Sequence, residues 1–148
     1  MAHVEETLAF LAGSEYAELS LPGKTLRREQ GRLYFDAPPV PALPPRALIP
    51  GESLELPEAG LRIATEIVRY RGEIHDLFKT SFLKYEILFP DLLCSGRLPG
   101  DSIRPLGRGC TKKLSALFKE AGRTRAQREL TPVVRNGEGP LLVWGLAL

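Results

Sequence analysis

Residues that interrupt regular backbone set the first limit on this fold. The 148 residues include 13 prolines and 14 glycines, about 18% of the chain. Proline removes a backbone donor and clashes with the preceding helical turn, while glycine inside a helix costs about 1 kcal/mol relative to alanine. A bundle of long helices is therefore excluded, and short strands, turns and a linker are expected.

The prolines are concentrated in one segment. Six of them fall within residues 37–50, APPVPALPPRALIP. Since neither a helical nor an alternating strand pattern runs through it, this segment predicts a semi-rigid extended linker or a strap on the surface. A proline-rich ligand for another protein is the alternative. We therefore predict three parts: an N-terminal part at 1–36, the linker at 37–51 and a C-terminal domain at 52–148.

The residue pattern of the N-terminal part predicts a helix followed by strands. Apolar residues at helical spacing in 4–11 indicate a short helix. In residues 17–35 the pattern changes to short alternating runs, separated by Pro22-Gly23 and Gln30-Gly31. This alternation with turn residues between the runs is typical of a small β-meander.

The residue pattern of the C-terminal domain predicts strands, with helices late in the chain. Its clearest helix has Thr111 as N-cap and ends at Gly122, with the core residues Leu114, Leu117 and Phe118 on one face. The other expected elements are strands at 52–56, 61–70 and 92–98, a second helix at 124–130, and a closing hairpin of 132–135 and 141–146 around the Asn136–Gly139 turn. Residues 74–93 fit either a helix or a strand. The expected fold is α+β: a small mixed β-sheet or barrel-like domain with two late helices, preceded by a short helix and a β-meander.

Several classes of protein are excluded by what the sequence lacks. No apolar run approaches the ~20 residues of a membrane span, and no secretory signal opens the chain. Two cysteines, Cys94 and Cys110, do not make a disulfide framework, so a cytoplasmic location is expected. The histidines and cysteines lack paired metal-ligand spacing, and we expect no metal site.

Charge is distributed unevenly along the chain. The net charge of +2 combines an acidic first part with a basic end: residues 97–148 hold ten Lys/Arg against four Asp/Glu. Such a local field suits a polyanion, because every phosphate that is neutralised releases bound counterions. A solvated basic face is the alternative interpretation.

The segment 107–113, GRGCTKK, is suited to phosphate although it lacks the order of a phosphate loop. Gly107 and Gly109 would let the backbone approach a ligand, and Lys112 and Lys113 would lie in the first turn of the helix, beside its unpaired N–H groups. Asp101, the nearest acid, is expected to pair with a neighbouring arginine (97 or 104) or to accept backbone N–H groups.

The same region carries a family resemblance. Arg97-Leu-Pro-Gly-Asp101, then Pro105-Leu106-Gly107, Thr111-Lys112-Lys113-Leu114 and Val143-Trp144, resembles the C-terminal domain of bacterial tRNA(Ile)-lysidine synthetases in order and spacing. Leu19-x-Leu21-Pro22-Gly23 and the stretch 26–35 are similar to the region that precedes that domain.

The resemblance implies an ATP-dependent ligase that joins lysine to the wobble cytidine of an isoleucine tRNA and so converts AUG to AUA decoding. Its chemistry belongs to a catalytic domain with an S-G-G-x-D-S loop, which this sequence does not contain. We therefore expect a tRNA-contacting C-terminal portion that is inactive alone, with ATP and Mg²⁺ bound elsewhere in the parent protein. Whether that parent is a homo-oligomer stays open.

The candidate site consists of basic residues and the loop residues between them. The expected phosphate contacts are Arg97, Arg104, Arg108, Lys112, Lys113, Arg125 and Arg128. The loop-shaping residues are Gly100, Asp101, Gly107 and Gly109. Two alternatives remain open: a protein-interaction module that uses the basic face and the proline-rich strap, and a small enzyme built around Asp101 and Cys110. No catalytic residue is assigned.

Overall fold

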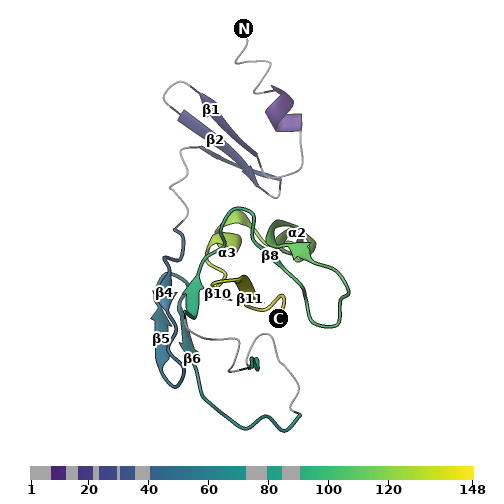
Figure 1. The fold of residues 1–148 in the computed structure, drawn as a ribbon. Helices are drawn as coiled ribbons and strands as arrows, with labels where there is room; N and C mark the ends of the chain where they lie inside the picture. The colour runs from purple at the N-terminus through teal and green to yellow at the C-terminus, as the bar shows by residue number, and fades with distance from the viewer. Residues whose placement is uncertain are drawn as a thin grey trace. The chain divides into compact units, whose positions relative to one another are not determined.

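The computed structural model describes residues 8–12, 17–21, 24–29, 31–35, 41–72, 80–84 and 91–148, and the chain divides into two compact units, Met1–Val40 and Pro41–Leu148 (Figure 1). His3, His75 and residues 37–40 of the expected linker lie outside the described residues, as do parts of the ambiguous stretch 74–93. None of the described helices is long and apolar enough to cross a membrane.

The first unit contains the predicted β-meander. Its strands are β1 (Ala17–Leu21), β2 (Lys24–Glu29) and β3 (Arg32–Phe35), paired antiparallel in the order β1-β2-β3. Residues 8–12 are helical. Phe10 is buried, and the Arg28 guanidinium lies 4.9 Å from its ring centroid, a cation–π contact between the helix and β2.

The second unit is built on a four-stranded antiparallel sheet with the order β11-β10-β7-β4. These strands are β4 (Arg46–Ala47), β7 (Leu93–Ser95), β10 (Val133–Asn136) and β11 (Gly139–Val143). The hairpin of β10 and β11 around Asn136–Gly139 is the predicted one, although β11 begins and ends earlier than expected.

The four-stranded sheet includes part of the expected linker, because β4 lies within residues 37–51. Arg46 pairs with Cys94 of β7, and the flanking side chains of Leu43 and Leu48 are buried. Residues before proline favour extended backbone, and an edge strand tolerates proline because one row of its N–H groups needs no partner strand. Residues 41–50 therefore belong to the second unit and do not form a free linker. They lie on its surface as a strap, with Leu43 and Leu48 buried and Pro41, Pro44 and Pro45 exposed.

The two faces of β10 and β11 are covered by different elements. The register pair Val133 and Val143 packs with Leu114, Leu117 and Phe118 of α2 (Leu114–Glu120). The opposite side is covered by a hairpin of β5 (Ser53–Leu56) and β6 (Leu61–Ala64), which end in a turn at 57–60. There the pair Val134 and Leu142 packs near Leu54 and Ile63, as the period of two along a strand requires. The expected core side chains of α2 are confirmed.

The beginning of α2 differs from the prediction. Thr111 is not its N-cap: Lys112–Lys113 form β9 and pair with β8 (Ser102–Ile103), and the helix starts only at Leu114, with Lys113 as an N-cap that makes no side-chain capping bond. The Leu114 N–H donates to the Asp101 carbonyl at 3.0 Å. A partner strand thus takes two residues that helical periodicity alone places in the first turn, and both lysines precede that turn.

The second helix follows its prediction closely. α3 (Arg125–Glu129) begins after Thr124, whose hydroxyl accepts the Gln127 N–H at 3.2 Å while the Gln127 side chain accepts the Thr124 N–H at 2.9 Å. This reciprocal pair is a capping box, a purely local device.

The fold class is confirmed in part. The second unit is a small, mostly β structure with two helices late in the chain, in keeping with the α+β expectation. The barrel-like arrangement is wrong for the described residues: their strands form separate sheets, every pair is antiparallel, and none closes into a barrel. β4, β8 and β9 have two residues each, too few for the continuous staggered pairing that a barrel needs.

Candidate nucleic-acid interface

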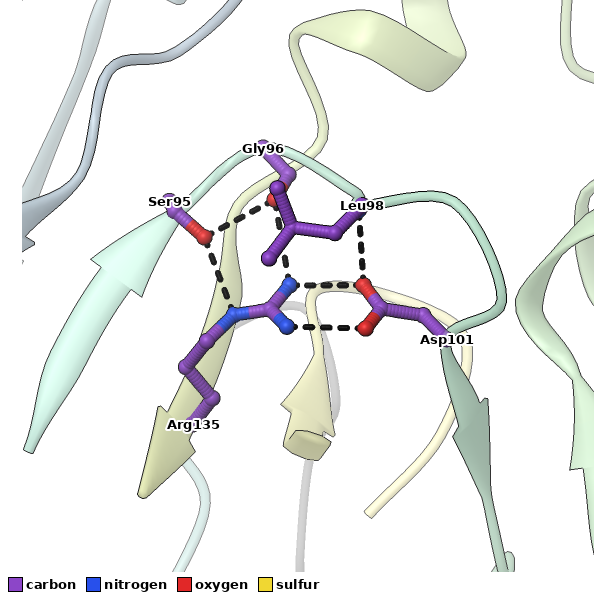
Figure 2. Close-up of polar contacts among 5 residues, drawn as sticks. All are labelled: Ser95, Gly96, Leu98, Asp101 and Arg135. Atoms are coloured by element: carbon purple, nitrogen blue, oxygen red, sulfur yellow. Dashed lines mark hydrogen bonds and ion pairs between the residues drawn. The ribbon is translucent and has the colours of Figure 1, made fainter. Parts of the chain in front are cut away.

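The loop 97–101, RLPGD, is held by Arg135, which is not among the site residues predicted from the sequence. Arg135, on β10, donates from both terminal nitrogens to the Asp101 carboxylate, at 2.8 Å (Nη1–Oδ1) and 2.7 Å (Nη2–Oδ2). Figure 2 shows the same guanidinium donating from Nε to Ser95 Oγ (3.0 Å) and from Nη2 to the Gly96 carbonyl (3.1 Å). Asp101 in turn accepts the Leu98 N–H at 2.7 Å. The buried Arg135 guanidinium therefore joins β10 to the end of β7 and to the loop.

The electrostatics of this pair follow from its burial. Burial alone would raise the pKa of the Asp101 carboxyl, but the hydrogen bonds from Arg135 and from the Leu98 N–H outweigh it, so this pKa lies below its ordinary value. The expected partners of Asp101 are corrected: it pairs with neither Arg97 nor Arg104, although the expected backbone N–H is found. Val133, Val134 and Arg135 are all buried because both faces of β10 are covered. A single charged residue that follows apolar residues in a buried strand needs a partner, and this pattern is the sequence signal that points to Arg135.

A pocket of about 180 Å³ lies against this loop. It is lined by four predicted site residues and by the first two residues of α2: Arg97, Gly100, Asp101, Lys113, Leu114 and Ser115. Arg97 is not free there, because its Nε and Nη2 donate to Glu129 Oε1 of α3 at 3.0 and 2.6 Å. Gly100 has φ +82, a left-handed turn conformation that suits glycine.

A second group forms around Glu120, at the last position of α2. Lys112 Nζ lies 2.5 Å from Glu120 Oε1, and Arg108 Nη1 lies 3.7 Å from Oε2. The hydrogen bond from Lys112 lowers the pKa of the Glu120 carboxyl, with a smaller contribution from Arg108. Two of the seven predicted phosphate contacts thus share one carboxylate.

The other predicted site residues are more dispersed. Arg104 is exposed and, like Lys113, has no ion-pair partner among the residues that the structure describes. Arg128 donates from Nε to the Arg123 carbonyl at 2.8 Å, and Arg125 lies half-buried in α3.

Of the two glycines in the segment before Lys112, only Gly107 is required by the backbone. The Arg108 N–H donates to the Pro105 carbonyl at 3.0 Å, and Gly107 between them has φ +77, the third position of a turn that requires positive φ. Gly109 is exposed and its backbone makes no such demand.

Alternative chemistries find little support in this geometry. Within the described residues no three His, Cys, Asp or Glu side chains converge as metal ligands. Cys94 is buried, and burial raises the pKa of its thiol to about 11, so it is protonated at neutral pH. Cys110 is exposed, while the Asp101 carboxylate is committed to Arg135, so the proposed pair of Asp101 and Cys110 has no available base.

The basic end of the chain coincides with a region that matches a known protein family. Residues 94–148 match the model of the TilS substrate C-terminal domain. Over 147 aligned residues the chain is 31% identical to a protein of Shouchella clausii (strain KSM-K16) named tRNA(Ile)-lysidine synthase. The alignment covers 94% of this chain but 30% of that relative, so the chain spans about a third of the relative's length.

Proposed function

Residues 94–148 are a TilS substrate C-terminal domain, and on that premise we propose that this chain is the tRNA-binding C-terminal portion of an ATP-dependent tRNA(Ile)-lysidine synthase. The parent protein would ligate lysine to the wobble cytidine of an isoleucine tRNA. Its ATP and Mg²⁺ would be bound by the parent's catalytic region, whose S-G-G-x-D-S loop does not occur in this sequence.

One observation carries the proposal: the matched domain coincides with the basic end of the chain, where ten cations face four acids over residues 97–148. Arg104 and Lys113 are exposed there and have no acidic partner within the described ranges. An exposed ammonium contacts phosphate as a point charge, whereas a guanidinium can donate two hydrogen bonds to one phosphate. We propose these two residues as the first phosphate contacts.

The mode of recognition follows from the shape of RNA. The deep major groove of A-form RNA hides the base edges, so a compact basic face recognises backbone shape and phosphates. The chain would therefore help to hold the tRNA, and base selection would rest with the rest of the parent protein.

The alternative of a protein-interaction module uses a strap that is partly built into the fold. Residues 41–50, the described part of the proline-rich strap, contribute β4 and the buried side chains of Leu43 and Leu48. These two side chains pack inward, while Pro41, Pro44 and Pro45 are exposed and accessible to a partner.

The proposal is tested by titrating fluorescent isoleucine tRNA with the 148-residue chain at several salt concentrations. Arg104→Ala combined with Lys113→Ala should weaken binding and reduce the slope of log K against log salt by about one to two units. Arg69→Ala combined with Lys84→Ala is the matched control, because it removes two exposed cations of the second unit outside the basic end that also have no ion-pair partner among the described residues. Equal effects of the two double variants, or binding without salt dependence, would contradict the proposal.

A further inference from the structure

Glu120 occupies a position that its own helix does not favour. It is the last residue of α2, where the C-terminal end of the helix dipole is negative and stabilises cations rather than carboxylates. Its charge is instead balanced by two cations from the preceding segment, Lys112 at 2.5 Å from Oε1 and Arg108 at 3.7 Å from Oε2. The carboxylate thus holds two cationic side chains together, one on each oxygen.

The Glu120 group is open to solvent. The side chains of Glu120 and Arg108 are 52% and 54% exposed, and that of Lys112 is 26% exposed. Ion pairs in such surroundings are weak, because water and salt screen both partners. A phosphate group that approaches this surface can reach the same two cations and offers more acceptor oxygens than a carboxylate.

The pair of Arg97 and Glu129 behaves differently. Glu129 is only 18% exposed, and a single oxygen of it accepts both Nε and Nη2 of Arg97. The Glu129 carbonyl also accepts the Leu43 N–H, which ties this end of α3 to the segment before β4. This acid is therefore part of the packing, whereas Glu120 can leave its partners without disturbing the fold.

We propose that Glu120 is an internal substitute for an RNA phosphate, and that binding of tRNA to this surface exchanges the Glu120 carboxylate for a backbone phosphate between Arg108 and Lys112. The inference rests on the proposed function and deepens it by assigning the exchange to one residue. In the free protein the carboxylate reduces the charge that the group presents from +2 to +1. It thereby weakens the attraction of this group for any polyanion, tRNA included, until a phosphate displaces it.

The proposal predicts that Glu120→Gln binds isoleucine tRNA more tightly, by about 3- to 10-fold at low salt, because the competing charge is gone. In the wild type the displaced carboxylate takes up about one cation when the phosphate binds, whereas the variant has no such carboxylate, so its slope of log K against log salt is steeper by about 0.9. Between 50 and 200 mM salt the variant should consequently lose about 3-fold more affinity than the wild type. Glu120 is exposed, so the variant should fold, and far-UV circular dichroism checks this.

Glu138→Gln is the matched control, because it removes the same charge from another exposed glutamate, on the turn between β10 and β11. A third comparison places Glu120→Gln on a background of Arg108→Ala and Lys112→Ala, where the gain should vanish. Tighter binding by Glu120→Gln than by Glu138→Gln, lost on that background, supports the exchange.

Two results would overturn the exchange. If the wild type binds tRNA with the expected salt slope but the two glutamine variants behave alike, this inference is wrong while the proposed function stands. If neither the wild type nor Glu120→Gln binds tRNA in a salt-dependent way, both are wrong.

Discussion

Asp101→Asn tests how the loop at the candidate site is held in place. The substitution keeps the size and shape of the side chain but removes the charge that faces the Arg135 guanidinium. Both side chains of the pair are only 9% exposed. In the variant the buried guanidinium keeps Ser95 Oγ and the Gly96 carbonyl as acceptors, but it faces a neutral amide where the carboxylate was.

The magnitude follows from this burial. Removal of one partner from a buried ion pair costs about 3–5 kcal/mol of the free energy of unfolding, because the other charge is left without compensation. The two remaining acceptors place the expected loss at the lower end, about 3 kcal/mol. A unit that runs from Pro41 to Leu148 has roughly 100 residues. It should lose about 4 °C of Tm per kcal/mol, or about 12 °C in total.

Urea unfolding followed by tryptophan fluorescence measures this loss in the correct unit, because the single tryptophan of the chain is Trp144. The sign of the pH dependence is set by the lowered pKa of Asp101 in the folded protein. The stabilisation is complete above the unfolded pKa of about 3.9 and is lost as pH falls toward the folded value. The difference between wild type and variant should therefore be full at pH 7 and decrease below about pH 4.

Asp91→Asn makes the same chemical change at an exposed position and should alter the free energy of unfolding by less than about 0.5 kcal/mol. A loss below about 1 kcal/mol for Asp101→Asn at pH 7 would refute the assignment of a buried, compensated pair. So would a difference between wild type and variant that stays constant down to the acid unfolding of the protein.

Two further predictions concern packing and thiol chemistry. A Cβ added at Gly96 would lie 3.0 Å from the Glu129 carbonyl, so Gly96→Ala should lower the free energy of unfolding by about 1–3 kcal/mol in the same urea assay. Gly109→Ala, where a Cβ meets nothing within 4 Å, should have much less effect, and equal losses would contradict the close approach at Gly96. Cys110 is exposed whereas burial raises the pKa of Cys94 to about 11, so a thiol reagent at pH 7.5 should modify one cysteine quickly and the second only after unfolding. Rapid modification of both in the native protein would show that Cys94 is accessible.

The elements that could be predicted are those whose signals are local. The Asn136–Gly139 turn, the β-meander and the capping box of Thr124 and Gln127 each depend on residues within a few positions of one another. The apolar face of α2 is likewise encoded by its own spacing, and its side chains lie in the core as that spacing predicts. The basic character of the C-terminal end is a matter of counting and needs no structure.

The elements that could not be predicted depend on partners far away in the chain. Residues 41–50 read as a linker because nothing within them reveals that β7, some 45 residues later, provides the partner for β4. Lys112 and Lys113 fit the first turn of a helix equally well until β8 pairs with them. In both places a strand partner decided between two conformations that the local sequence allowed.

The candidate site divides in the same way. Sequence alone determined which residue types it contains: cations and glycines between residues 97 and 128, with few acids among them. Only the tertiary structure decided how these charges are balanced, because Asp101 and Arg135 are 34 residues apart and Arg97 and Glu129 are 32 apart. An ion pair depends on distance in space and on exclusion of water, and neither is set until the sheet and helices have packed.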